Sequence, residues 1–222
     1  KDLGFTPMPI NEAAAVVYSD TERQARVMAA MSETERSKHT AASGLGISFG
    51  AGMINVALVH RGLLVRAFSL PFGGDFIDES AAKATNTPVA QVTLLKEEGL
   101  DLNHNRLAGE AKPYHDATTH RQVEALCLMY RELLTKLRDA LVDFFSRPDN
   151  RVGDVKHVLP VIVSGGTSRP AGFLDLFDEI VLKDLDLRFP TATSATHVTD
   201  PMGAVTAGAV VCARMRLEAA KK

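Results

Sequence analysis

The chain has 222 residues, of which 45% are hydrophobic and 23% are charged, and its formal net charge is −2. This composition is typical of a globular protein, and the small net charge gives no reason to expect nucleic acid as a partner. Cys127 and Cys212 lie in apolar helical patterns, so we expect two reduced core thiols and a reducing, cytoplasmic compartment. No apolar run approaches the roughly 18 residues of a membrane span, and we expect neither a membrane segment nor a signal peptide.

The first 43 residues predict helical structure followed by a polar loop. The sequence starts at Lys1 without an initiator Met and enters structure almost at once, so we expect it to be part of something longer. Residues 3–9 are interpreted as a strand or an entry loop. Asn11 to Met31 is Ala-rich and helical in pattern, with a break near Asp20, which is placed to cap a second helix. Ser32 to Ser43 is polar and predicts a surface loop.

The segment from Gly44 to Gly74 predicts an antiparallel meander around which the rest of the chain is organised. Its three apolar runs are Leu45 to Phe49, Asn55 to His60 and Leu63 to Leu70. The first turn, Gly50-Ala51-Gly52, can bring bare backbone N–H groups close to an anion, because neither glycine carries a Cβ atom. The same Gly-x-Gly pattern also occurs in ordinary hairpins, so both interpretations stay open.

The middle of the chain predicts helices on either side of an irregular segment. Asp75 to Ala84, with Asp75 as its N-cap, and Pro88 to Glu98 are expected to be short helices. Gly99 to Thr119 is polar and irregular, and the three dispersed histidines near it are expected to be solvated rather than bound to metal (His104, His115 and His120). His120 to Arg147 is the strongest helix signal, since its apolar residues recur at steps of three and four.

The last third predicts a second glycine turn at the end of a buried strand. His157 to Ser164 is the expected strand, and it runs into Gly165-Gly166. In α/β folds, a strand, a glycine turn and a helix together present a ligand site at the carboxyl end of the strand. For both glycine turns to face one ligand, this strand must run parallel to Leu45–Phe49. The elements expected after the turn are a helix from Pro170 to Asp178, a strand from Glu179 to Leu182, a connector from Leu187 to His197, and a helix from Met202 to Glu218 with Asp200 as N-cap and Pro201 as its first residue.

Four segments, in this order, resemble the actin-like ATPase superfamily, which includes heat-shock chaperone ATPases, bacterial actins, and pilus-assembly and division homologues. They are INEAAAVVY (Ile10 to Tyr18), GISFGAGMINVALV (Gly46 to Val59), VSGGTSRP (Val163 to Pro170) and DPMGAVTAGAV (Asp200 to Val210). Phe68 to Ala82 also resembles the passage from strand to helix that leads into the smaller subdomain. The resemblance covers the second of that fold's two lobes, and the first lobe would precede Lys1.

The resemblance implies an α/β fold, a ribonuclease-H-like lobe with a mixed β-sheet, flanking helices and a smaller inserted α+β subdomain. The larger subdomain would comprise residues 1–74 and 151–222, and the smaller one residues 75–150. The implied nucleotide-binding positions are Ser48, Gly50, Ala51 and Gly52 in the phosphate hairpin, Lys96 in the smaller subdomain, and Gly165, Gly166, Thr167 and Arg169 in the adenosine turn. Glu12 matches the residue that orients the attacking water, although a Glu in the first turn of a helix is also favoured by the helix dipole.

One departure from the family pattern bears on the chemistry. Ser48 stands where the family has an Asp that holds Mg²⁺ through water, and Met53 replaces a Thr. A neutral hydroxyl is a poor substitute for a carboxylate toward a hard dication. Ser48 therefore puts hydrolysis in doubt, and no residue of this chain is assigned as a metal ligand.

The resemblance implies two functions of different kinds. The first is the ATP- or ADP-binding lobe of an actin-like or chaperone-like ATPase, with Mg²⁺ in the complete protein and the first lobe supplied by the same or a separate chain. The second is a catalytically degenerate scaffold that binds a protein partner or assembles into filaments. A sugar-kinase-like or acyl-kinase-like relative is less favoured, because no segment resembles a sugar-binding loop. For the chain alone we expect no ATPase activity and roughly millimolar nucleotide binding.

Overall fold

The structure is a computed structural model that describes residues 9–30, 32–33, 42–104, 106–107, 116–153 and 155–219. Residues 3–8 of the expected entry segment at 3–9, and most of the expected loop at 32–43, lie outside the described residues.

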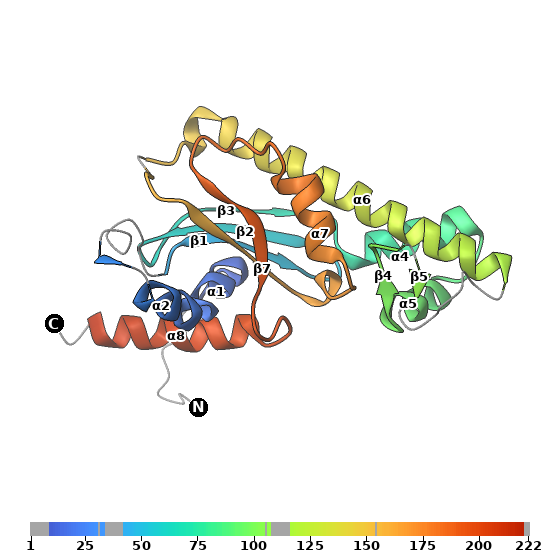
Figure 1. The fold of residues 1–222 in the computed structure, drawn as a ribbon, viewed down its shortest axis with the longest axis horizontal. Coiled ribbons are helices and arrows are strands. Elements are labelled where there is room, and N and C mark those ends of the chain that lie inside the picture. The colour runs from blue at the N-terminus through green and yellow to red at the C-terminus, as the bar shows by residue number, and fades with distance from the viewer. Residues whose placement is uncertain are drawn as a thin grey trace, which may run out of the picture.

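A five-stranded mixed sheet with the order β3-β2-β1-β6-β7 lies at the centre (Figure 1). Its strands are β1 (Gly44–Phe49), β2 (Ile54–His60), β3 (Leu63–Leu70), β6 (Leu159–Ser164) and β7 (Thr191–His197). The first three strands form an antiparallel meander. β6 runs parallel to β1, with Ser164 opposite Ser48, and β7 runs parallel to β6. The predicted meander and the predicted parallel pairing are therefore confirmed.

Helices cover both faces of the sheet (Figure 1). On one side lie α1 (Glu12–Ser19), α2 (Thr21–Ala29) and α8 (Ala204–Ala219). On the other lie α6 (Ala117–Ser146) and α7 (Phe173–Phe177). Because side chains alternate along a strand, β1 sends Ile47 and Phe49 into the larger apolar cluster with α6 and α7. Gly46 faces α1, where an added Cβ atom would lie 2.2 Å from the Ala13 carbonyl oxygen, so α1 packs directly on β1.

A smaller group of elements lies at the far end of α6, on the right in Figure 1. It contains α4 (Gly74–Thr85), α5 (Val89–Glu97), β4 (Leu100–Asp101) and β5 (Arg106–Leu107). The 30-residue helix α6 connects this group with the central sheet. Its buried residues belong to one continuous apolar cluster, which also contains Ile77 of α4 and Leu45 of β1.

Two expected elements near the C-terminus were wrong. Glu179 to Leu182 is not a strand but part of a π-helix, Asp178–Leu182, which continues directly from α7. The expected connector from Leu187 to His197 contains β7, which pairs with β6. β7 has the sequence TATSATH, which lacks the apolar alternation of a typical strand. It tolerates this composition because it lies at the edge of the sheet and is mostly half-exposed.

Several helix starts also differ from the sequence-based expectation. The long helix begins at Ala117, where the Asp116 carboxylate accepts hydrogen bonds from the Thr118 and Thr119 N–H groups. α4 begins at Gly74 rather than after an Asp75 cap. Pro170 does not start a helix. It lies between a 3₁₀ turn, Gly166–Ser168, and α7, which begins only at Phe173.

The last helix begins at Ala204, two residues later than expected. The Asp200 carboxylate accepts a hydrogen bond from the Met202 N–H, so it stabilises the turn before the helix. A similar short turn follows α6, where residues Pro148–Asn150 form a 3₁₀ helix.

The two cysteines differ in their surroundings. Cys127 is buried, and burial raises the pKa of its thiol to about 11, whereas Cys212 on α8 is only half-buried. Because the thiolate is the reactive form, we expect iodoacetamide at pH 8 to alkylate Cys212 in the native protein and to leave Cys127 unmodified. Peptide mass spectrometry after a timed pulse measures this, with the denatured chain as the control in which both react. Equal labelling of both residues in the native chain would contradict the burial of Cys127.

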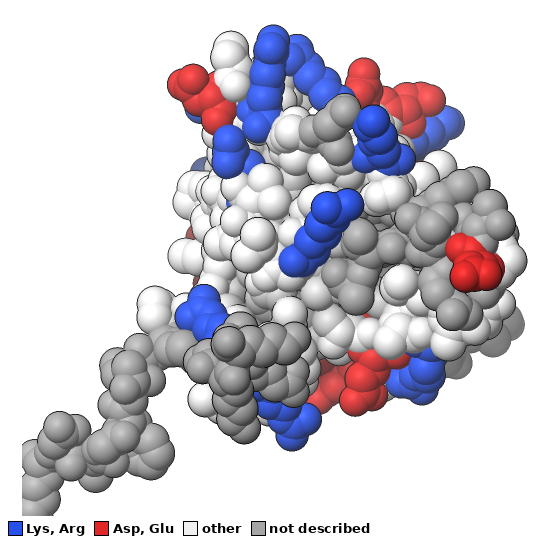
Figure 2. All heavy atoms as spheres, turned by 90° about the vertical axis from the view of Figure 1, so that its left-hand side faces the viewer, with Lys and Arg blue, Asp and Glu red and all other residues white. Residues whose placement is uncertain are grey.

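Among the described residues, no helix is both long and apolar enough to cross a membrane. Figure 2 shows the end of the molecule where the β2–β3 turn lies, and there lysine and arginine side chains are interspersed with aspartate and glutamate. Charges of both signs therefore share this face.

Candidate functional site

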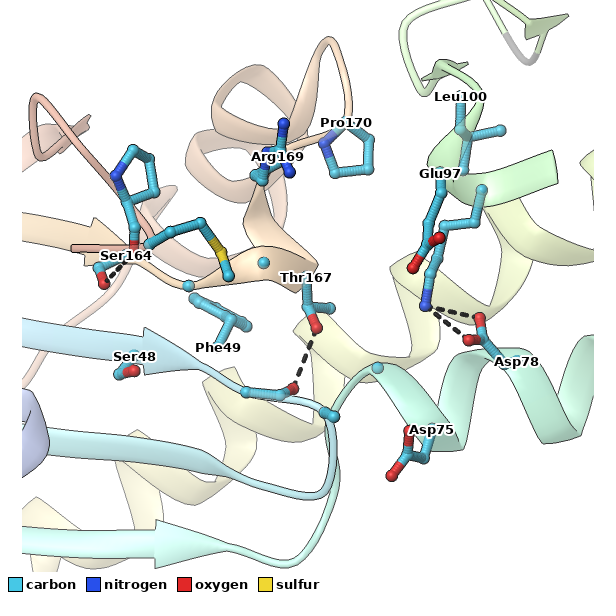
Figure 3. Close-up of a pocket in the computed structure, with 18 of the residues that line it drawn as sticks. Ser48, Phe49, Asp75, Asp78, Glu97, Leu100, Ser164, Thr167, Arg169 and Pro170 are labelled. Atoms are coloured by element: carbon cyan, nitrogen blue, oxygen red, sulfur yellow. Dashed lines mark hydrogen bonds and ion pairs between the residues drawn. The ribbon is translucent and has the colours of Figure 1, made fainter. Parts of the chain in front are cut away.

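A pocket of about 810 Å³ opens where β1 and β6 end and faces α4 and α5 (Figure 3). Nine of the ten site residues expected from the sequence line it: Glu12, Ser48, Gly50, Ala51, Lys96, Gly165, Gly166, Thr167 and Arg169. Gly52 is the exception, since it is exposed at the tip of the hairpin and does not line the pocket. The two glycine turns therefore lie at the same edge of the sheet, as the parallel pairing of β1 and β6 requires.

The two glycine turns are joined by a direct hydrogen bond. The Thr167 hydroxyl donates to the Gly50 carbonyl oxygen at 3.0 Å, and both residues face the pocket (Figure 3). Gly165 has a φ of +103°, and a Cβ atom there would lie 2.2 Å from the Phe49 carbonyl oxygen. Only glycine suits this backbone conformation at so close an approach, so the second turn is pressed against the end of β1.

The hairpin turn also holds the start of α4. The Gly74 N–H donates to the Gly50 carbonyl at 3.0 Å, and the Asp75 N–H donates to the Ala51 carbonyl at 2.8 Å. These carbonyls take the place of the side-chain cap that the sequence predicted at Asp75, since they satisfy N–H groups that a helix leaves free at its start. The position of this turn is therefore coupled to the position of α4 through these two hydrogen bonds.

Glu12 lies at the side of the pocket next to β1 and β2, and both of its carboxylate oxygens accept hydrogen bonds. The Ser48 hydroxyl donates to Oε1 at 2.6 Å, and the Asn55 side-chain amide donates to Oε2 at 2.8 Å. The Ser69 hydroxyl in turn donates to the Asn55 amide oxygen at 2.6 Å. The sequence indicated Glu12 and Ser48 but missed Asn55 and Ser69. The strand register of the predicted meander could have identified them. Ser48 pairs with Asn55 across the first two strands, and Asn55 pairs with Ser69 across the next two.

On the opposite wall, Lys96 of α5 pairs with Asp78 of α4. The Lys96 ammonium nitrogen is 2.7 Å from each Asp78 carboxylate oxygen, and the Thr93 hydroxyl donates to Oδ2 at 2.9 Å. The two charged side chains are only 12% and 7% exposed. The sequence missed Asp78, although its spacing of four residues from both Gly74 and Ala82 places it on the buried side of α4.

The remaining polar groups are arranged around the second turn. Arg169 is exposed at the rim beside Pro170 (Figure 3). The Tyr130 hydroxyl donates to the Thr167 carbonyl at 3.1 Å, and burial raises the pKa of Tyr130 far above its ordinary value. Tyr130 therefore stays neutral and supports the turn from beneath. The charged side chains that line the pocket are Glu12, Asp75, Asp78, Glu97, Lys96 and Arg169.

Two of the four carboxylates that line this pocket already accept hydrogen bonds from neighbouring donors. Within the described ranges, no cluster of three or more His, Cys, Asp or Glu side chains is placed to hold a metal ion. The Glu12 carboxylate is engaged by Ser48 and Asn55, and the Asp78 carboxylate by Lys96. Mg²⁺ prefers several oxygen ligands, usually with one or two carboxylates, and the Asp75 and Glu97 carboxylates also line the pocket.

Comparison with solved structures shows an actin-type fold. MreB5 of Spiroplasma citri bound to ADP aligns with a TM-score of 0.57 and 15% identity, over 95% of this chain and 61% of that one. A chain of the PilM–PilN type IV pilus biogenesis complex aligns with a TM-score of 0.55 and 16% identity, over 95% and 54%. The ethanolamine utilization protein EutJ from Carboxydothermus hydrogenoformans aligns with a TM-score of 0.50 and 17% identity, over 77% and 49%. The chain thus spans between 49% and 61% of the length of these structures.

The sequence comparisons give a more specific result. A search of curated proteins gives no match. A family model described as volactin matches residues 1–213, which is nearly the whole chain. The structural neighbours are actin-like ATPases, and the five-stranded mixed sheet with flanking helices agrees with them. The chain therefore has the actin-type fold and belongs to the volactin family.

Proposed function

We propose that this chain is the second, adenine-nucleotide-binding lobe of an actin-like protein. The observation that carries the proposal is the hydrogen bond from Thr167 to the Gly50 carbonyl, which joins two glycine turns at the edge of one pocket. Turns of this kind let backbone N–H groups approach an anion closely. The MreB5 neighbour is described as bound to ADP, which supports a nucleotide as the ligand of this fold.

Each lining group has a role in this proposal. The turn at Gly50 and Ala51 would contact the phosphates, and the turn from Gly165 to Thr167 would contact the nucleoside. Arg169 at the rim would lie against the adenine ring, since a guanidinium group stacks well on a flat π-system. Lys96 would contact the ribose while its ammonium group stays paired with the Asp78 carboxylate.

We also propose that a first lobe completes the site. The chain's coverage of only 49% to 61% of its structural neighbours supports this. Within the chain, residues 1–74 and 151–222 would form the larger subdomain and 75–150 the smaller one, because α4, α5, β4 and β5 gather at one end of α6 (Figure 1). We expect the assembled protein to work in the cytoplasm, in keeping with its unpaired thiols.

The second candidate function is a non-hydrolysing scaffold that binds a protein partner or its own copies. The specific observation in its favour is that both oxygens of the Glu12 carboxylate already accept from neutral donors, which leaves fewer acceptor sites for an attacking water. The PilM–PilN structure, described as a complex for pilus biogenesis, supports a partner protein as the ligand of such a scaffold. Phosphate release by the assembled protein separates the two functions, since turnover would exclude the scaffold.

Calorimetric titration of the chain with ADP tests the nucleotide site. One lobe supplies about half of the contacts of a micromolar two-lobed site, so we expect a dissociation constant of roughly 1 mM. Arg169→Ala is expected to weaken binding about fivefold through the lost stacking, whereas the matched surface change Arg214→Ala on α8 should leave it unchanged. Equal affinity in the wild-type and Arg169→Ala chains would show that ADP does not bind against Arg169.

A further inference from the structure

The polar residues beside Glu12 form a row across three strands. Ser48 of β1 lies directly opposite Asn55 of β2, and Asn55 lies directly opposite Ser69 of β3. Ser48 is 2% exposed and Asn55 is 9% exposed. Residues paired across neighbouring strands point to the same face of a sheet. Here that face is the one covered by α1, whose first residue is Glu12.

The hydrogen bonds in this row have only one consistent direction. The Glu12 carboxylate can only accept, so the groups that face it, the Ser48 hydroxyl and the Asn55 Nδ2, must both donate. The Asn55 amide oxygen then faces Ser69, whose hydroxyl donates to it at 2.6 Å. Glu12 therefore fixes which end of the Asn55 amide points toward it, and Ser69 satisfies the other end.

A divalent cation at this carboxylate would disrupt the row. A cation that coordinated Glu12 through the lone pairs that face β1 and β2 would have to displace the Ser48 hydroxyl or the Asn55 amide, and either group would then be buried without a partner. Leaving a buried donor unsatisfied is costly, while the neutral Ser48 offers little in return to a hard cation. The row and the cation are thus alternative ways of balancing the charge of Glu12.

We propose that Asn55, whose amide oxygen accepts from Ser69, takes the place of a divalent cation beside Glu12, so that Glu12 does not serve as a Mg²⁺ ligand in this chain. Asn55 and Ser69 are positioning residues, because they act on the pocket through Glu12. The inference rests on the proposed function for its consequence, which is that Mg²⁺ does not act through Glu12 when this chain binds a nucleotide. Its test contains no nucleotide, so its failure and the failure of the proposed function are distinguishable.

The test is Asn55→Asp, which replaces the amide with a second carboxylate and keeps its shape. In EDTA, we expect the midpoint of thermal unfolding at pH 8 to fall by at least about 6 °C, because two carboxylates then meet without a donor between them. Millimolar Mg²⁺ is expected to restore most of this loss, since Glu12, the new Asp and the Ser48 hydroxyl would supply three oxygen ligands. The wild-type midpoint should not respond to Mg²⁺ beyond the effect of matched NaCl.

Asn86→Asp is the matched control, because Asn86 is exposed at the end of α4 and away from the pocket. Its midpoint is expected to stay within about 2 °C of wild type with or without Mg²⁺. A loss in Asn55→Asp that Mg²⁺ does not reverse would contradict the proposal, since a merely structural amide would behave in this way.

Two further measurements keep the inference testable if Asn55→Asp does not fold. Ser48→Asp places the second carboxylate on the other side of Glu12, and its midpoint should also rise with Mg²⁺. Calorimetric titration with MgCl₂ alone should give the same heats for the wild-type chain and for Glu12→Gln. Saturable binding of Mg²⁺ to the wild-type chain, abolished by Glu12→Gln, would overturn the proposal outright.

Discussion

Replacing Lys96 with Met is expected to lower the free energy of unfolding by about 3 kcal/mol, the lower end of the cost of breaking a buried ion pair. The Asp78 carboxylate would then remain buried with the Thr93 hydroxyl as its only hydrogen-bond donor among those that the structure shows. Met keeps the length and apolar stem of Lys, so the loss isolates the charge. For a chain of this length the change corresponds to a fall of roughly 6–12 °C in the unfolding midpoint.

The partner substitutions sharpen this result. Lys96→Met combined with Asp78→Leu removes both charges, and it should recover most of the stability, because a buried pair is often no better than apolar residues of similar size. Asp78→Asn alone should cost less than Lys96→Met, since the long Lys96 side chain can turn its ammonium group toward solvent. Urea unfolding of the four chains measures this. Equal losses in the double and the single Lys96 variants would show that the ion pair is not the source of the effect.

Gly208→Ala is the second substitution with a large expected effect. A Cβ atom at Gly208 of α8 would lie 1.8 Å from the Ala15 carbonyl oxygen of α1, so the two helices would have to move apart. Ala favours a helix by about 1 kcal/mol over Gly, but overpacking a tight contact with backbone costs up to about 3 kcal/mol or more. We therefore expect a net loss of at least about 2 kcal/mol, measured by urea unfolding.

Gly153→Ala is the matched control for this substitution. A Cβ atom at Gly153 would meet no atom within 4 Å, so the change is expected to alter stability by no more than about 0.5 kcal/mol. If Gly208→Ala were as stable as Gly153→Ala, α1 and α8 would not be packed as closely as the structure places them.

The sequence predicted the centre of the fold well because its strands are apolar and its turns contain glycine. Leu45–Phe49 becomes a buried strand, as does the Leu159–Ser164 part of the expected His157–Ser164, and their parallel pairing followed from the requirement that the two glycine turns share an edge. β7 was missed because an edge strand needs no apolar alternation. The start of α4 was misplaced because carbonyl oxygens of a distant hairpin, rather than the Asp75 side chain, satisfy its first N–H groups.

The candidate site was predictable only where it lies in contiguous motifs. The turns at Gly50 and Gly165 carry a local signature, and the structure brings them together. Asn55, Ser69 and Asp78 carry no such signature, because each acts through a partner that is distant in sequence. The structure also gives Ser48 a different role from the one that the sequence indicated. From the sequence it is the position where a carboxylate is missing, whereas in the structure it is a donor to Glu12.

The measurement that tests the central claim most directly is a nuclear magnetic resonance titration of the isotope-labelled wild-type chain with ADP in EDTA. If both glycine turns bind one nucleotide, the amide signals of Gly50, Ala51, Gly166 and Thr167 will shift together with one dissociation constant of roughly 1 mM. A smaller hollow of about 190 Å³, lined by Gln24 and Val158 among others, serves as the internal control. The amide signals of Gln24 and Val158 should not shift. Shifts confined to that hollow, or to only one of the two turns, would contradict a shared nucleotide site.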